Sequence, residues 1–571
     1  MYLAYEPSTV GTARTAVHIV LFGSTSKRGK GFSSASGRSL AAVIVVGLLA
    51  ACGGPAGSAS GGAGSPRSGG TLAIGIESET DILDPQRAGG WVSWRVNRQM
   101  FEPLVDEDLS KPSAQAAVPP LRPGLATSWE VSPDGTSYTF HIRPNVKFHD
   151  GTPLDAAAVE FNIRRVWDKT FQYYDAKSAG QTTFVWQELK SIALPDPMTV
   201  QLTMKQAFEP FLRLLGQGGS GSTGIMSPES IKKYGNDNVG EHPTGTGPFT
   251  FVDRVRGQRI TLARNSHYWG TKPYLDKVVF RPLPDPAARV AALRANEVDM
   301  IAVPPPDSVG TLKQSGFQLS EGAPPHVWYL AFNMSDPIMK NKLVRQAINL
   351  AIDRQGMATN LLKDTVKPAY DVQAPANAAY VENTAAYGYN PEKAKQLLAQ
   401  AGYPNGFSTQ MMTSVDGSGQ IIPVPMAEYI QQNLAKVGIQ IQLQTSEWIS
   451  YLTKWAQGTP PGVGWAQQSW GMTTPYWLYI ATSATLKAPK GPNVGGYDNP
   501  ELDNVMKQAI SSTSESQAVE LWKQANRIVT DDAAIAPIVN DKAPYILSAK
   551  VQGFVSPSEE WYDLNTVWLS R

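Results

Sequence analysis

The sequence predicts an α/β protein in which strands alternate with capped helices and pair mainly in parallel. Hydrophobic residues make up 42% of the 571 residues, enough to build a large core. A chain of this length exceeds what one core can serve, so we expect about three or four folding units. The α/β class itself follows from strand and helix signals that succeed one another along the chain.

The first predicted elements lie in the N-terminal third. Thr71–Ile76 (TLAIGI) predicts a strand. A hairpin follows, whose strands Trp129–Val131 and Tyr138–Ile142 flank an Asp-Gly turn. The stretch GTPLDAAAVEFNIRRVWD then predicts a helix, for which we expect Thr152 as the N-cap and Asp155 as the partner in a capping box.

Later helices carry clear start and stop signals, mostly an Asp or Asn before Pro at the start. Such helices are predicted at Asp285-Pro286, Asn390-Pro391, Ile421–Val437, Asn499-Pro500 and Ser514–Thr530. Gly402 and Gly438 end the second and third of them, because glycine adopts the left-handed conformation that follows many helices. Short strands such as VDMIAV and IQIQLQ lie between these helices.

The first 51 residues predict a leader. Five Lys and Arg residues against one Glu precede an apolar run, Leu40–Ala51, which is too short to span a bilayer and ends in small residues, as in a signal peptide. The sequence LAAC up to Cys52, the single cysteine, resembles the bacterial lipobox, in which the sulfur is acylated. We therefore expect a leader over 1–51, lipidation at Cys52 and a flexible Gly/Ser-rich tether over 52–70. The alternative is an ordinary buried cysteine.

The rest of the composition excludes several functions. The net charge of +1 argues against a nucleic-acid partner. The chain contains no G-x-S-x-G, H-E-x-x-H or G-x-x-x-x-G-K-[ST] motif, and its six histidines lack zinc-like spacing. We therefore expect no enzymatic activity, no metal and no cofactor.

Aromatic residues are the remaining chemical signal. Trp91 and Trp94 follow a glycine pair in RAGGWVSWR, and a second group occupies GVGWAQQSWGMTTPYWLYI, residues 462–480. Flat apolar faces at this density indicate a ligand cleft for the group as a whole, whereas core packing is the expectation for any single Trp among them.

Six segments, in order, resemble one family closely. They are Leu125–Arg165, His242–Phe251, Leu262–Gly270, Leu330–Met357, Tyr389–Phe407 and Gly495–Ala509. Together they are similar to blocks of the family 5 extracellular solute-binding proteins of ABC transporters, which include oligopeptide and dipeptide binders.

This resemblance implies a two-lobed periplasmic-binding-protein fold, type II-like, with an extra subdomain. We therefore expect the chain to divide into three parts. Lobe I comprises residues 71–100, 242–322 and 531–571, the extra subdomain comprises 101–241, and lobe II comprises 323–530. The lobes would shut over a solute by hinge motion and present it to a permease, without chemical change.

The solute is less well defined by the resemblance. Peptide binders of this family carry an aspartate shortly after a Trp-Gly pair, which anchors the ligand's amino terminus. Here Thr473 takes that position and Tyr476 the place of a second aspartate. Either another carboxylate, such as Glu77 or Glu79, takes the role, or the solute lacks a free amine.

We expect a lipid-anchored, monomeric solute-binding protein of an ABC importer, on the extracellular face of the cytoplasmic membrane or in the periplasm. Peptides are the expected cargo. The alternatives are an oligosaccharide, opine, haem or metal-chelate solute, a solute sensor, or a cell-surface glycoside hydrolase with two facing carboxylates. The expected cleft residues are Trp91, Asn333, Trp465, Trp470 and Thr473.

Overall fold

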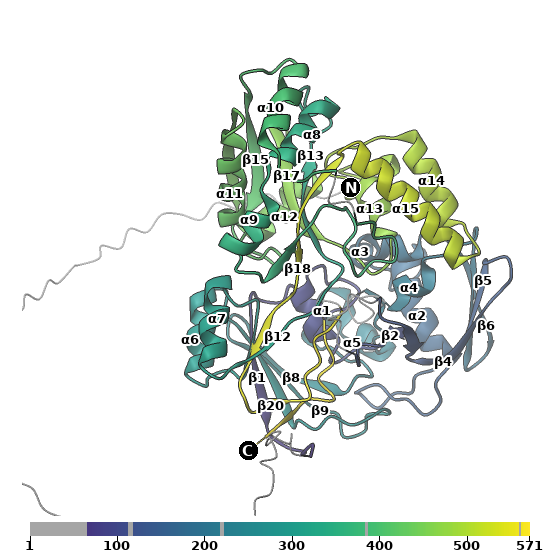
Figure 1. The fold of residues 1–571 in the computed structure, drawn as a ribbon. Coiled ribbons are helices and arrows are strands. Elements are labelled where there is room, and N and C mark those ends of the chain that lie inside the picture. The colour runs from purple at the N-terminus through teal and green to yellow at the C-terminus, as the bar shows by residue number, and fades with distance from the viewer. Residues whose placement is uncertain (1–64, 112–117, 217–221, 383–385, 559–560, 571) are drawn as a thin grey trace, which may run out of the picture. The chain divides into compact units, whose positions relative to one another are not determined.

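The computed structural model describes residues 65–111, 118–216, 222–382, 386–558 and 561–570 (Figure 1). The expected leader, Cys52 and most of the expected tether lie outside these residues. No helix within the described ranges is both long enough and apolar enough to cross a membrane.

A seven-stranded sheet forms lobe I. Its order is β12 (Gln318–Ser320), β19 (Tyr545–Leu547), β11 (Met300–Ala302), β1 (Thr71–Ile76), β10 (Lys277–Pro282), β9 (Arg259–Arg264) and β8 (Phe249–Val255). Helices α6 (Pro286–Arg294) and α7 (Pro306–Gln314) pack beside it (Figure 1). Asp285 caps α6 by accepting the backbone N–H of Ala288, as its sequence predicts.

A six-stranded sheet forms lobe II. Its order is β14 (Val366–Pro368), β18 (Ile535–Asp541), β13 (Val327–Phe332), β17 (Val463–Trp470), β15 (Phe407–Ser414) and β16 (Ile439–Ser446). The helices of this lobe are α8 (Lys342–Ala351), α9 (Arg354–Gly356), α10 (Pro391–Gln400), α11 (Pro423–Ala435) and α12 (Trp448–Ala456). Strands β13 and β17 are buried along almost their whole length, because one face packs in the core of lobe II and the other in the core that includes the four-stranded sheet.

A four-stranded sheet forms a further subdomain. Its order is β4 (Ala126–Val131), β5 (Ser137–Ile142), β7 (Thr199–Met204) and β6 (Leu189–Asp196), and α2 (Ala156–Trp167) and α3 (Ala176–Trp186) accompany it. The predicted β4–β5 hairpin is confirmed. The predicted cap of α2 is wrong: Asp155, not Thr152, accepts the N–H of Ala158 and begins the helix.

Three helices near the C-terminal end of lobe II share one buried core with this subdomain: α13 (Trp477–Thr482), α14 (Pro500–Ile510) and α15 (Glu515–Asp531). The ring of Tyr476 packs against Phe208, and the N–H of Glu209 donates to the carbonyl of Ile510. Ser514 caps α15, which confirms the last predicted helix.

The remaining elements are short. They are α1 (Trp91–Asn97), β2 (Val105–Glu107), β3 (Leu121–Pro123), α4 (Phe211–Gly216), α5 (Pro228–Asn238), η2 (Val239–Glu241), η3 (Met357–Leu361), η4 (Ala484–Leu486), β20 (Val551–Gln552) and β21 (Trp568–Leu569). Strand β2 pairs with β3, and β20 pairs with β21.

The expectation of mainly parallel strands is wrong. Among the described strand pairs, those of β1 with β10 and β11 and those of β15 with β16 and β17 are parallel. The four-stranded sheet is antiparallel throughout. Elsewhere, some antiparallel pairs are hairpins such as β8–β9. Others include a strand that has just entered from the other lobe, as when β19 pairs with β11 and β13 pairs with β18. Local strand signals do not reveal such distant partners.

Two neighbouring chain segments connect the lobes. β12 leads into β13 through residues 321–326, and β18 leads into β19 through residues 542–544. In Figure 1, β18 runs from the six-stranded sheet toward β12. The N–H of Gly322 donates to the carbonyl of Lys542, with 2.7 Å between nitrogen and oxygen. Because β18 pairs with β13, the chain leaves lobe II after Asp541, whereas we expected it to leave at 531. The other expected domain boundaries stay predictions.

Candidate ligand-binding site between the lobes

Trp91 begins α1 and is held by the loop before it. The backbone N–H of Gly89 donates to Asp81 Oδ2 at 2.9 Å, and the hydroxyl of Ser93 also donates to Asp81. The indole N–H of Trp94 returns to the carbonyl of Ala88 at 2.9 Å. These bonds fix where the helix begins and therefore where Trp91 lies.

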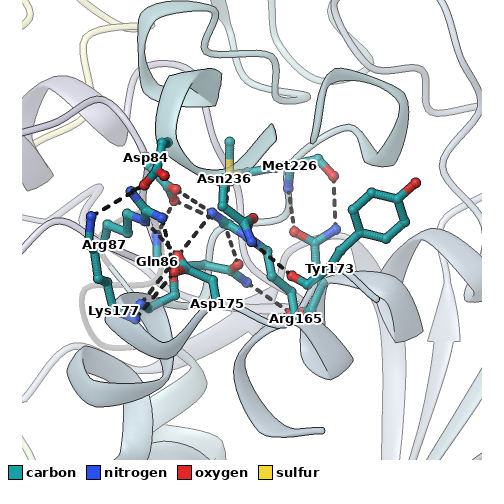
Figure 2. Close-up of polar contacts among 12 residues, drawn as sticks. Asp84, Gln86, Arg87, Arg165, Tyr173, Asp175, Lys177, Met226 and Asn236 are labelled. Atoms are coloured by element: carbon teal, nitrogen blue, oxygen red, sulfur yellow. Dashed lines mark hydrogen bonds and ion pairs between the residues drawn. The ribbon is translucent and has the colours of Figure 1, made fainter. Parts of the chain in front are cut away.

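A buried ion network anchors the same loop to the four-stranded subdomain. Arg165 of α2 donates to Asp84 at 2.6 Å, and both side chains are completely buried. Arg87 donates to Asp175 at 2.6 Å, and Asp175 in turn caps α3. Figure 2 shows these side chains converging on one another. Removing one partner would leave a buried charge unpaired, which costs about 3–5 kcal/mol.

Trp91 contacts lobe II through the segment that connects the lobes. Its ring lies edge-on to the imidazole of His326, with 4.3 Å between the ring centroids. Gly419, whose φ is +73°, lies against both rings, and a Cβ there would come within 2.6 Å of Trp91. This glycine therefore allows lobe II to approach the indole closely.

His326 is buried and neutral. The distance between its Nε2 and the hydroxyl oxygen of Ser469 is 2.5 Å. Burial lowers the pKa of His326 to about 3. The imidazole therefore serves as an uncharged hydrogen-bonding group beside Trp91 at neutral pH.

A belt of neutral polar side chains continues from His326 into lobe II. We call Thr413, Ser414, Ser418, Gln420, Gln467, Gln468 and Ser469 the polar belt; all are buried. Thr413 Oγ1 donates to Gln467 Oε1 at 3.0 Å, and Gln467 donates to Gln420. Within the described part of the chain, the hydroxyls of Ser414 and Ser418 and the Nδ1 of His326 have no hydrogen-bond partner. Buried groups of this kind are available to the amide or hydroxyl groups of a ligand.

A second contact joins Thr473, between β17 and α13, to Glu107 of β2. Thr473 Oγ1 donates to Glu107 Oε1 at 2.9 Å, and both residues are buried. Burial raises the pKa of Glu107 to about 7. Glu107 carries no local signal in the sequence, because an acidic residue in VDEDLS resembles one in an ordinary exposed turn.

The two carboxylates suggested by the sequence, Glu77 and Glu79, are engaged elsewhere. Glu77 forms an ion pair with Arg95, with 2.7 Å between Oε1 and Nη1. Glu79 pairs with Arg254 at 3.0 Å and accepts the N–H of Gly257. Neither carboxylate accepts the hydroxyl of Thr473, which donates to Glu107.

The five expected cleft residues lie in different environments. Trp91 and Thr473 lie at the two contacts described above, and Trp470 is half-buried at the end of β17. Trp465 is completely buried in the core of lobe II beside Phe332. The side chain of Asn333 donates to the carbonyl of Val463 at 2.9 Å. Their roles as ligand contacts stay predictions.

Two cavities lie away from the contacts of Trp91 and Thr473, and their walls are different. A depression of about 530 Å³ in lobe II is lined by charged residues that include Lys340, Arg345 and Asp532. A cavity of about 40 Å³ lies beside the ion pairs of Arg98 and Arg122. Neither is lined by Trp91, Thr473 or a residue of the polar belt.

Comparisons with known proteins agree with this architecture. Residues 120–488 match the model of the bacterial extracellular solute-binding proteins, family 5. The chain is 32% identical to Heme-binding protein A of Haemophilus influenzae, over 76% of this chain and 82% of that protein. It is 29% identical to the glutathione-binding protein GsiB of Escherichia coli K12, over 85% of this chain and 91% of that protein.

Solved structures show the same fold. The periplasmic binding protein DppA of Helicobacter pylori, solved in complex with the peptide STSA, is 28% identical to this chain. It superposes with a TM-score of 0.78 and covers 88% of this chain and 99% of that one. The expected glycoside hydrolase alternative is thereby set aside, because this family binds solutes and does not act on them. The chain therefore belongs to the family 5 bacterial extracellular solute-binding proteins, and it is a two-lobed, extracytoplasmic binding component of an ABC importer and not an enzyme.

Proposed function

We propose that this protein captures short peptides between its lobes and delivers them to a membrane permease. The polar belt is the observation that supports a peptide cargo. A peptide brings backbone N–H and C=O groups that lose water when the lobes close over it, and each of them needs a partner. Buried hydroxyls and amides of Ser414, Ser418 and Gln468 supply neutral donors and acceptors of that kind.

The two chain segments between the lobes provide the hinge for this capture. A ligand that touches only one lobe does not change the balance between open and closed forms. A peptide lying between Trp91 and the polar belt contacts both lobes in the closed form alone. Its binding energy therefore favours closure, and the permease receives a form that signals an occupied cleft.

The cargo can be identified directly. Native mass spectrometry of protein purified from its own host measures the mass of any retained solute. Isothermal titration calorimetry with Ser-Thr-Ser-Ala, Met-Leu, glutathione and haemin then compares the solute classes found among similar proteins. We expect a peptide to bind most tightly. Retention and tight binding of haemin, with no heat from any peptide, would contradict the peptide proposal.

We further propose that Cys52 carries the lipid that holds the protein at the membrane. The LAAC sequence and the following Gly/Ser-rich stretch support this proposal. The full chain expressed in a bacterial host should incorporate radiolabelled palmitate and partition into the detergent phase of Triton X-114. Cys52→Ser should remain in the aqueous phase without label, and its peptide affinity should be unchanged. A wild-type protein without label would contradict the anchor.

A further inference from the structure

The expected tether enters lobe I at one end of the seven-stranded sheet. Strands β1, β10 and β11 run away from this end, and β9 and β19 run toward it. The N–H of Gly69 donates to the carbonyl of Tyr274 at 2.7 Å, and the N–H of Gly70 donates to Asp276 Oδ2 at 3.0 Å. These bonds hold the entry point against the loop that precedes β10.

The segments that connect the lobes lie at the other end of this sheet. Residues 321–326 follow β12 at Ser320, and residues 542–544 precede β19 at Tyr545. Ser320 pairs with Tyr545, which also pairs with Ala302 at the end of β11. Since β11 runs away from the entry point, both connections leave from the opposite end. In Figure 1, the C-terminus lies at the tether end of the sheet and β18 beyond the other end.

Basic side chains surround the entry point of the tether. Lys277 begins β10, and Arg264 ends β9. Lys550 follows β19, and Lys272 lies in the loop between β9 and β10. Arg67 belongs to the described end of the expected tether. We call these five residues the basic edge. The sheet topology thus brings cations from three separate parts of the chain to one place.

The acids beside the basic edge neutralise only two of its members. Asp276 pairs with Arg264 at 2.6 Å, and Asp299 pairs with Lys550 at 2.5 Å. The other three members are exposed, and none of them bonds to a residue that the structure describes. The first 51 residues hold five of the 50 Lys and Arg residues and one of the 49 Asp and Glu residues. The remaining chain is therefore slightly acidic, and the excess of cations is local to this edge.

We propose that the basic edge binds the headgroups of anionic phospholipids. The inference rests on the proposed lipid at Cys52, because that lipid is what brings this end of lobe I to a membrane. Seventeen residues separate Cys52 from Gly70. A chain of that length reaches at most about 60 Å, so the bilayer lies within reach of the edge. Lysine and arginine side chains close to an anionic membrane surface are attracted to it.

Contact at the basic edge orients the anchored protein. The connections to lobe II lie at the other end of the sheet, so they point away from the bilayer when the edge rests on it. Cargo then reaches the space between the lobes from the outside. Attraction between exposed charges is screened by salt, so the contact is reversible and the protein is free to turn toward its permease.

The test uses the chain without its leader and with Cys52→Ser, so that binding reports the basic edge and not an acyl chain. Residues 63–571 form one compact unit, so this chain keeps the whole fold. It is sedimented with vesicles of phosphatidylcholine alone, or of equal parts phosphatidylcholine and phosphatidylglycerol. We expect at least tenfold stronger partition into the anionic vesicles, and loss of that difference as salt rises from about 20 to about 500 mM.

Charge reversal locates the binding surface. Lys272→Glu combined with Lys277→Glu should reduce partition into the anionic vesicles at least tenfold. The matched control combines Lys393→Glu with Lys436→Glu, two exposed lysines of lobe II whose reversal changes the net charge equally. The control should partition like its parent. Thermal unfolding and cargo affinity should be unchanged in both pairs, because neither pair lies between the lobes.

The Cys52→Ser chain contains no cysteine, which allows a label at one chosen site. A fluorophore is attached at Thr271→Cys, beside the basic edge, or at Gln400→Cys, on α10 of lobe II; both positions are exposed. Energy transfer to a rhodamine-labelled lipid then reports distance from the bilayer. We expect clearly stronger transfer from position 271 than from position 400.

Three results would overturn the basic edge as a lipid-binding surface. They are equal partition into the two kinds of vesicle, undiminished partition of the Lys272→Glu, Lys277→Glu variant, and equal energy transfer from the two labelled positions. The anchor is tested separately by the palmitate label of the full chain. If the full chain takes no label while the Cys52→Ser chain still binds anionic vesicles through the edge, the anchor falls and the surface stands.

Discussion

The indole of Trp91 and the imidazole of His326 meet edge-on, 4.3 Å apart between ring centroids, where lobe I contacts the segment that connects the lobes. The loop before Trp91 is anchored by buried ion pairs, and His326 is bonded to Ser469 of lobe II. Lobe I therefore fixes the position of the Trp91 ring, and lobe II fixes that of the His326 ring. Their contact therefore reports how closely the lobes approach.

Trp91→Ala should weaken cargo binding. The substitution removes an aromatic pair worth about 0.5–1.5 kcal/mol beyond the apolar area it buries, so we expect an affinity loss of roughly 10- to 50-fold. Calorimetry with the retained cargo measures the loss. Trp129→Ala, in the half-buried middle of β4, is the control and should bind like wild type. Equal affinity of Trp91→Ala and wild type would show that Trp91 does not contact cargo.

Gly419→Ala should hinder closure. The new Cβ would lie 2.6 Å from the Trp91 ring and 3.0 Å from His326, so the lobes must move apart to accommodate it. We expect a larger radius of gyration in small-angle X-ray scattering with cargo present, and at least tenfold weaker binding. Gly257→Ala is the matched control, because Gly257 has a similar φ, +70°, and no atom within 4 Å of the added methyl. An unaltered scattering profile for Gly419→Ala would contradict a closing role of this contact.

Acid should favour the open form through His326. Its pKa is near 3 when buried and returns toward its ordinary value when the lobes part, so the neutral, closed form loses stability as pH falls below about 6.5. At pH 5 the loss is about 2 kcal/mol. The groups facing the imidazole are Trp91, Ser469 and Asp541, the last at 4.0 Å, and the charge of Arg95 also lowers this pKa.

The measurement compares wild type with His326→Gln from pH 8 to pH 5 by scattering and by cargo affinity. Glu107 titrates in the opposite sense, because its raised pKa disfavours the closed form at high pH, and it does so in both proteins. The difference between the two curves therefore isolates His326. Parallel curves would show that the imidazole does not link pH to opening.

The sequence predicted helices and turns better than it predicted contacts between residues far apart in the chain. Helix starts such as Asp285, Asn390 and Ser514 were predictable, because a capping side chain bonds to backbone two or three residues away. The glycines of GTGPF lie where two backbone segments approach each other closely. A Cβ on Gly245 or Gly247 would come within 3 Å of the backbone of Met100.

Strand direction and site chemistry depend on distant partners. The pairing of β18 with β13 joins segments about 200 residues apart, and neither segment carries a signal for the other. Glu107 is buried where it meets Thr473 and Arg213, which lie far from it in the sequence. Trp465 is the opposite case. It belongs to the aromatic group that indicates a ligand cleft, yet it lies in the core of lobe II, because β17 is buried on both faces.

Glu209→Gln should stabilise the protein at alkaline pH and have little effect at acid pH. Burial, with a smaller contribution from Glu515, raises the pKa of Glu209 to about 7, and Arg213 opposes the rise. Below about pH 4.5 the carboxyl is protonated in both the folded and unfolded states and has no penalty. Between about pH 4.5 and 7 the unfolded state ionises while the buried carboxyl of the folded state stays protonated, so stability falls across this range. Above about pH 7 the folded state ionises the buried group as well, and the loss is complete.

The neutral amide avoids that ionisation, so Glu209→Gln should gain about 2 kcal/mol over wild type at pH 8. Urea unfolding at pH 5 and pH 8 measures the free energy of unfolding at each pH. Glu229→Gln, an exposed carboxylate paired with Lys232, is the control and should change by less than about 0.5 kcal/mol. A gain of equal size at both pH values would show that packing of the amide, and not the titration of Glu209, is responsible.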